Sequence, residues 1–272
     1  MSAAAPPPVS VPPAKPAAPP PAAPPARPHP RLGELHDAGT VRKESVDVDR
    51  WFATGLVKVT GDTNVGQGNL DGTVILGGRL TATRVRYRGV LDVEGALEAS
   101  ENLSGVGSLR AGSTAHAGTA DLKGTVRVLG ALTVDRGLVL HGSLAAPSAT
   151  VGELDLEGEA QVPGELVGLR LNAFLKEDSA FGTVRSRSVT IRGKPPNLVE
   201  KVFFRHLTVT VRRIEADVAE LEGVDVTFVR APKITLGRDA HVTEYEGTIV
   251  KQHASARVGF ESKSRPPYGL RR

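Results

Sequence analysis

A glycine recurs every 16 to 18 residues through the middle of this 272-residue chain, and this period constrains the fold more than any other feature. A small aliphatic residue stands two and four places after most of these glycines, as in GTVRVLG (124–130). Repeats of this length are typical of solenoids, in which each repeat forms one turn of a coil. The repeating glycines are Gly55, Gly72, Gly89, Gly107, Gly124, Gly142 and Gly158.

Within each repeat, apolar and polar residues alternate, which predicts strands with one buried face. After Gly124, the alternation places Val128 inward and Arg127 outward, and Val59 and Val93 hold the same place as Val128 in earlier repeats. Two further alternating runs per repeat predict three short strands per turn. The prediction is an all-β parallel β-helix with triangular turns of about 17 residues and glycine at the corners, where positive φ is needed.

The composition changes at both ends of the repeats and once between them. Most of the 20 prolines lie near the N-terminus, where they predict a disordered arm. The stretch RGKPPN interrupts the alternation, which then returns in a less regular form. These changes predict an arm at 1–34, a main β-helix domain at 35–192, a linker at 193–198, a second short β-helical segment at 199–261 and a basic disordered tail at 262–272.

The sequence contains few of the residues and motifs that are typical of catalytic or ligand-binding sites. It has no cysteine, so thiolate metal sites and cysteine nucleophiles are excluded. The cluster VGQGNLDG (65–72) lacks the third glycine and the helix of a phosphate loop, so we interpret it as a turn corner. His116 and His141 are expected to point outward as solvated side chains. We therefore predict no enzyme, no catalytic residue, no cofactor and no metal site.

The bulk properties bear on partners and location. Aromatic residues make up 4% of the chain, and the net charge of +4 is interspersed with acids, so nucleic-acid binding is not expected. No segment approaches the roughly 20 apolar residues of a membrane-spanning helix. The N-terminus does not have the pattern of a signal peptide, and the expected location is cytoplasmic.

The repeats from Gly55 to Gly168 resemble the bactofilins, a family of polymer-forming cytoskeletal proteins. The elements VRA (229–231), ITLG (234–237) and TEY (243–245) are similar to a second segment of the longer members. The resemblance implies a right-handed β-helix that stacks end to end into nucleotide-independent filaments and acts as a scaffold. The implied partner is the protein itself, with scaffold clients binding through the arm or the tail. The family's membrane-targeting peptide is not evident, so membrane association stays open.

Two other functions stay open as alternatives. Hexapeptide acyltransferases are left-handed β-helices with an 18-residue turn and a histidine base, whereas the spacings here mix 17 and 18. A β-helix can also be a monomeric binding module. Loops inserted between turns, which form the cleft of polysaccharide lyases, are missing from the regular repeats.

Assembly is expected at the helix ends, because both expose unpaired backbone groups and apolar residues. Trp51 and Phe52, at the start of the regular repeats, are candidates for a local cap or for the assembly interface. Val59 is the residue to alter if the first regular repeat is terminal. If residues 36–52 cover that repeat, the open end is expected near Phe260.

Overall fold

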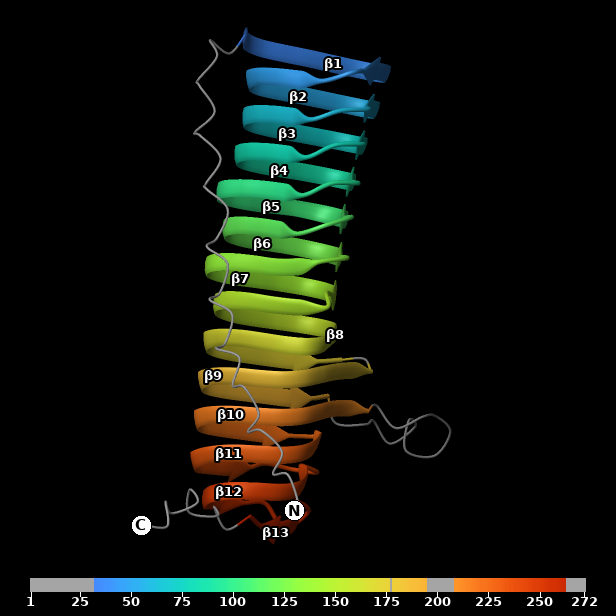
Figure 1. The fold of residues 1–272 in the computed structure, drawn as a ribbon. Coiled ribbons are helices and arrows are strands. Elements are labelled where there is room, and N and C mark those ends of the chain that lie inside the picture. Colours follow the sequence, from blue (N-terminus) through green and yellow to red (C-terminus); the bar gives the residue numbers. More distant parts are fainter. Residues whose placement is uncertain (1–31, 177, 195–207, 263–272) are drawn as a thin grey trace, which may run out of the picture. The chain divides into compact units, whose positions relative to one another are not determined.

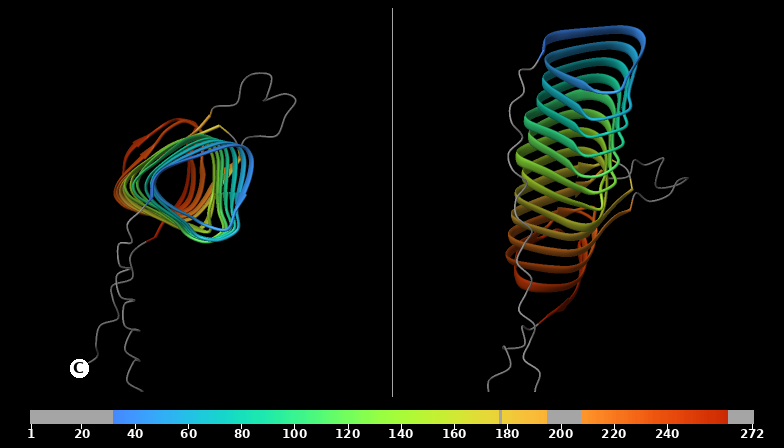
Figure 2. Two further views of the ribbon diagram at one scale, coloured as in Figure 1. Left: turned by 90° about the horizontal axis from the view of Figure 1, so that it is seen from above. Right: turned by 45° about the horizontal axis from the view of Figure 1, so that its top comes forward.

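The structure is a computed structural model that describes residues 32–176, 178–194 and 208–262. These residues form a β-solenoid of 13 strands, in which each strand pairs in parallel with the next along the chain (Figure 1). Seen along its axis, the coil is three-sided (Figure 2). The predicted all-β parallel β-helix is therefore confirmed. The strands are β1 (Leu32–Lys43), β2 (Val46–Val59), β3 (Thr63–Leu76), β4 (Leu80–Val93), β5 (Leu97–Ala111), β6 (Ala115–Val128), β7 (Ala131–Ala145), β8 (Ser148–Leu175), β9 (Ser179–Gly193), β10 (Val209–Glu222), β11 (Asp225–Leu236), β12 (His241–Gln252) and β13 (Arg257–Glu261).

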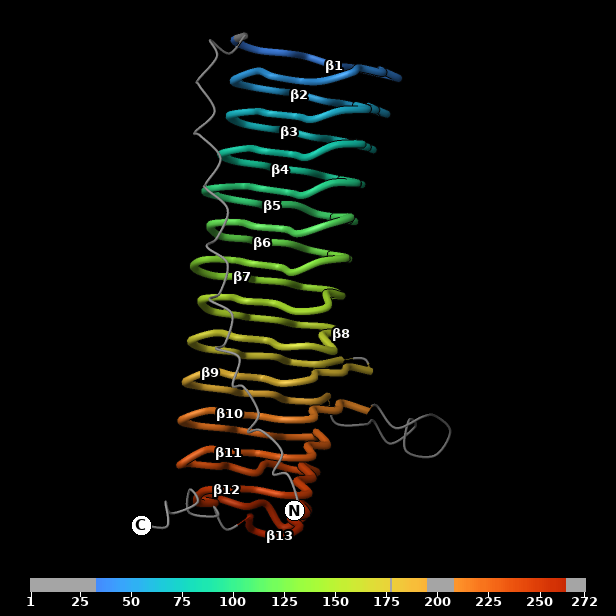
Figure 3. Tube along the Cα trace, viewed as in Figure 1, coloured from blue at the N-terminus to red at the C-terminus, as the bar shows by residue number. Residues whose placement is uncertain are grey.

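Each regular turn is formed by one long bent strand, and not by the three short strands expected per repeat. β4 runs without a break from Leu80 to Val93, and its pairing with β3 continues through Gly89. Gly89 has a φ of 108°, so the chain bends there while the hydrogen-bond ladder continues. The 28-residue β8 passes through two turns, as the Cα trace in Figure 3 shows.

The repeating glycines lie in register and form one corner of the coil. Gly72, Gly89 and Gly107 pair in successive strands, and all have positive φ. A Cβ atom at Gly107 would lie 2.0 Å from the carbonyl oxygen of Gly89. The backbone conformation and the close approach of neighbouring turns both exclude a side chain at this corner.

The core is a column of inward side chains that runs through the described turns. Val59, Val93 and Val128 are exposed by 2% or less, whereas Arg127 is exposed to solvent. These side chains occupy the inward and outward positions that the alternation predicts. The same column passes from Phe181 of β9 to Val211 of β10, so the core is continuous across the predicted linker.

The solenoid does not divide into two segments, which corrects the predicted domain boundaries. β9 pairs directly with β10, from Ser179 opposite Val209 to Arg192 opposite Glu222, so 35–192 and 199–261 contribute to one sheet. Of the expected linker, Gly193 belongs to β9, and 195–198 lie outside the described residues. β1 begins at Leu32, inside the predicted arm, whose other residues up to 31 lie outside the description, as does the predicted tail from 263.

Candidate assembly interface

The two ends of the solenoid each have a strand with a neighbour on one side only. Within the described residues, β1 pairs only with β2, and β13 pairs only with β12. The outer edge of an end strand presents backbone N–H and C=O groups in the spacing that another strand requires. These two edges are the candidate site.

At the N-terminal end, the inward positions of β1 combine apolar and charged residues. Leu35 and Val41 are partly buried against the core. Asp37 lies between them and is 7% exposed, which makes it the only buried carboxylate among the described residues. The Lys43 ammonium lies 3.2 Å from Asp37 Oδ1, and Trp51 Nε1 donates a hydrogen bond of 2.9 Å to Asp37 Oδ2.

At the C-terminal end, the last turn is incomplete, and partly buried apolar residues lie behind it. β13 covers only the part of β12 from His241 to Tyr245. Tyr245, Ile249 and Val258 are partly buried hydrophobic residues that pack against the core from this end. Phe260 is 61% exposed in β13. Its partner in the register is Glu244, which lies next to the inward Tyr245, so Phe260 belongs to an outward column.

The structure places the sequence-derived candidates in two groups. Val59, Val93 and Val128 are core residues of inner turns, and only Phe260 lies at an end. Val59 is not in a terminal turn, because β1 covers it with Lys43 directly opposite. The condition attached to Val59 is thus not met, and an open end near Phe260 stays a prediction.

Trp51 and Phe52 belong to the second described turn and form neither end of the coil. Trp51 is 0% exposed and lies beneath Leu35 of β1. Phe52 points outward, where its ring stacks on His36 with centroids 4.7 Å apart and planes inclined by 8°. The pair connects the first two turns, Trp51 through the core and Phe52 on the surface.

The ion pair at the N-terminal end was missed by the sequence reasoning, although a signal was present. Gly39 stands 16 residues before Gly55 and pairs with it in the sheet. Extending the repeat by one turn would have placed Val41 and Lys43 at the two inward positions after Gly39. In most repeats the glycine is followed by two aliphatic residues at these positions. Here Lys43 takes the place of the second one, so the repeat was not recognised.

The sides of the coil bring no reactive groups together in the described residues. His116 Nε2 lies 3.1 Å from Asp135, and His141 Nδ1 lies 3.0 Å from Glu157, each pair exposed and separate from the other. In the same ranges, no group of three histidine, aspartate or glutamate side chains is placed to hold a metal ion. These contacts join neighbouring turns and have the geometry of surface ion pairs.

A hollow of about 710 Å³ lies on the side of β2 to β6 and includes Phe52, Arg86, Arg88 and Lys123 in its lining. Tyr87 also contributes to this lining, but its side chain is only 3% exposed, and burial raises its pKa to about 12. The Tyr87 ring occupies the space beside Gly105, since a Cβ atom there would lie 2.1 Å from a ring carbon. The tyrosine is therefore part of the packing and is not poised to exchange a proton.

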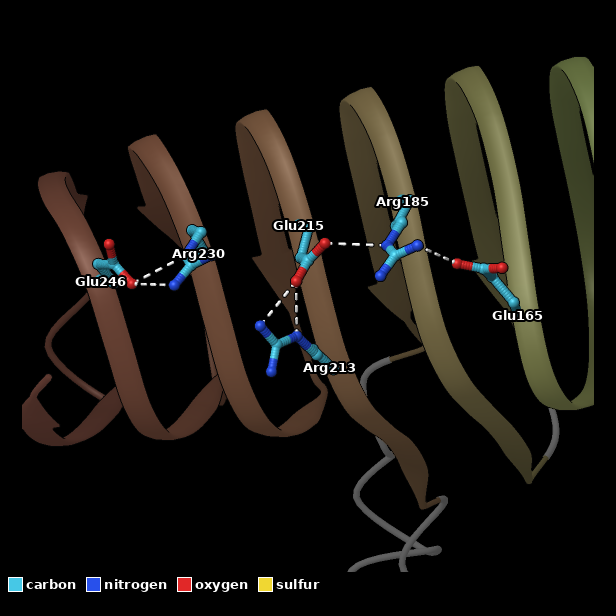
Figure 4. A network of polar contacts seen from close by, with 6 residues as sticks. All are labelled: Glu165, Arg185, Arg213, Glu215, Arg230 and Glu246. Atoms are coloured by element: carbon cyan, nitrogen blue, oxygen red, sulfur yellow. Dashed lines mark hydrogen bonds and ion pairs between the residues drawn. The ribbon is translucent and has the colours of Figure 1, made fainter. Parts of the chain in front are cut away.

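A chain of alternating charges follows the surface of the C-terminal turns (Figure 4). Glu215 accepts hydrogen bonds from Arg185 at 2.9 Å and from Arg213 at 2.7 Å, and Arg185 also contacts Glu165 at 2.7 Å. Burial raises the pKa of Glu215, but the hydrogen bonds from Arg213 and Arg185 outweigh it, so the pKa lies below its ordinary value. The Arg213 guanidinium also lies 4.6 Å from the centre of the Phe228 ring.

These charged residues join turns that lack the regular glycine corner. Arg185, Glu215 and Arg230 are direct partners in the register of β9, β10 and β11, and Arg230 bonds to Glu246 of β12 at 2.8 Å. Opposite charges on directly paired residues favour this register, and a slip that placed Arg185 opposite Arg213 would bring like charges together. The cluster thus has a structural role.

Comparisons with family models, with curated proteins and with solved structures found no match to this chain.

Proposed function

We propose that this protein is a structural protein that assembles end to end through its solenoid and serves as a scaffold in the cytoplasm. The observation that carries the proposal is the state of the two ends. Within the described residues, the outer edges of β1 and β13 have no partner strand, and partly buried apolar residues lie behind them.

Stacking of a second copy on either end repeats the contact already made between neighbouring turns. It places another strand about 4.8 Å from the edge, which satisfies the exposed backbone groups. It also removes water from residues such as Leu35, Ile249 and Val258. No nucleotide is required, because the contact has the same chemistry as the inside of the coil.

The resemblance to bactofilins supports the same function. The part of the chain that the structure describes has no helix long and apolar enough to cross a membrane. We do not assign catalysis, since the two outward histidines each contact a single carboxylate and share no cleft.

The proposal is tested with substitutions at the C-terminal end. Ile249→Lys places a charge on a residue that packs against the core at this end, so it should block assembly. Val250→Lys is the matched control, because Val250 is its neighbour but is 58% exposed. Sedimentation and electron microscopy across a concentration series, with and without ATP or GTP, measure the outcome. We expect nucleotide-independent filaments for the wild type and for Val250→Lys, and none for Ile249→Lys. A wild type that stays monomeric at physiological salt contradicts the proposal.

A further inference from the structure

The first described turn carries two charges at inward positions that are apolar in the turns beneath it. Lys43 lies opposite Val59, and that column continues to Leu76. Asp37 lies opposite Ala53 in the same way. The change from apolar to charged residues thus occurs at the turn that a joining copy would touch.

Both charges are held in place by contacts within the end turns. Lys43 Nζ is 3.2 Å from Asp37 Oδ1, and Trp51 Nε1 donates to Asp37 Oδ2 at 2.9 Å. The Lys43 side chain is 27% exposed, against 7% for Asp37. In a single copy the ammonium group therefore still reaches water while the carboxylate is almost enclosed.

A second copy stacked on this end would remove the remaining water. The ion pair would then lie inside the joint, and taking two charges out of water costs free energy that their attraction repays only in part. Replacing such a buried pair by apolar residues is often neutral or stabilising. Charges that point inward at an edge are also a recognised protection of sheets against uncontrolled pairing.

Among the described residues, the C-terminal turn has no inward ion pair of this kind. Tyr245, Ile249 and Val258 pack against the core there, and the inward position opposite Leu236 is held by the uncharged Gln252. Glu261 follows Tyr245 in the register but is exposed. The two ends of the described solenoid are therefore chemically different.

We propose that the Asp37–Lys43 pair limits end-to-end assembly by weakening every joint formed at the N-terminal end. The pair keeps this end soluble in the single copy and makes assembly there dependent on a higher protein concentration. This inference rests on the proposed function, because it concerns the strength of the joint that assembly requires. The partner is a second copy of the chain, whichever of its ends is stacked.

The test is the double variant Asp37→Asn with Lys43→Val. The valine matches Val59 directly beneath it, and the asparagine keeps an oxygen that accepts the Trp51 N–H. We expect the critical concentration for assembly, measured by sedimentation, to fall about tenfold or more. Circular dichroism and thermal melting check that the variant is folded.

The matched control is Glu34→Gln with Arg50→Gln. These residues form an ion pair at the same end, with Arg50 Nη1 2.8 Å from Glu34 Oε1, but both side chains are about half exposed. The control removes one acid and one base from the end without changing its inward surface. Its critical concentration should equal that of the wild type.

A second variant, Lys43→Met, keeps the proposal open to refutation if the double variant does not fold. It leaves the Asp37 carboxylate without its cation, so a joint would bury an unpaired charge, and the critical concentration should rise about tenfold. An unchanged or lower critical concentration for Lys43→Met overturns the inference.

The outcomes separate this inference from the proposed function. A folded double variant that assembles no better than an assembling wild type overturns the inference and leaves the proposed function intact. If the double variant assembles and the wild type stays monomeric, the result supports the limiting pair but contradicts self-assembly of the native chain. If neither protein assembles, both proposals are overturned.

Discussion

At the scale of single residues, the position of a side chain relative to the glycine corner determines how much its substitution changes the stability of the fold. Val128 is 2% exposed, and its column neighbour Ala111 is 0% exposed. Arg127 is next to Val128 in the chain but points to solvent. Adjacent residues in a strand therefore differ in energetic role because their side chains leave opposite faces.

The first prediction compares these two neighbours. Val128→Asp buries a charge with no partner and should lower the free energy of unfolding by about 3 kcal/mol or more. Arg127→Asp should change it by less than about 1 kcal/mol. Thermal melting followed by circular dichroism distinguishes them, and equal melting temperatures would show that the inward register is wrong.

At the scale of the strand, ion pairs between directly paired residues support the register of the C-terminal turns. On β10, Glu215 accepts hydrogen bonds from Arg185 of β9 and from Arg213 of β10 itself. Because the pKa of Glu215 is lowered in the folded state, the group stabilises the fold at neutral pH. That stabilisation is lost as the pH falls through the lowered pKa, below the ordinary glutamate value of about 4.3.

The second prediction follows from the direction of the Glu215 pKa shift. Glu215→Gln should lower the free energy of unfolding at pH 7 by about 1 kcal/mol, and the difference from wild type should shrink as the pH falls through the lowered pKa of Glu215. Urea unfolding across a pH series from 7 downward measures it. Asp217→Asn on the same strand is the control, since Asp217 is exposed. A difference that persists undiminished across the whole acidic range in which the protein stays folded would rule out the charge as its source.

At the scale of the whole molecule, the described turns form one unbroken sheet, and each turn contacts mainly its neighbours. Stability in such a coil is approximately a sum over turns and the interfaces between them. The segments predicted to lie outside the coil should therefore contribute little to the fold. The arm is the longest of them.

The third prediction is that deletion of residues 1–30 leaves folding and end-to-end assembly intact. This segment lies outside the described residues, and its composition predicts that it buries no face of its own. The melting temperature should stay within a few degrees, and the deletion should alter only side-by-side association or recruitment of clients. A truncated protein that no longer folds would refute a disordered arm.

Much of the fold was determined by the sequence itself. Contacts in a solenoid are made between the same positions of successive turns, so a period in the sequence is also a period in space. The glycine spacing and the two-residue alternation were therefore enough to predict the parallel coil, its corner and inward residues such as Val93 and Val128. They were also enough to predict that His116 and His141 face outward.

Only the tertiary structure decided where the coil begins and what lies at its ends. A terminal turn has a neighbour on one side only, so its residues need not follow the repeat. Asp37, Lys43 and Trp51 come from two turns and meet because Gly39 aligns with Gly55, which the irregular sequence of the first turn conceals. The pairing of β9 with β10 across residues 195–207 was likewise decided by contacts between distant segments. Local periodicity thus determined the interior of this protein, and contacts between turns determined its boundaries.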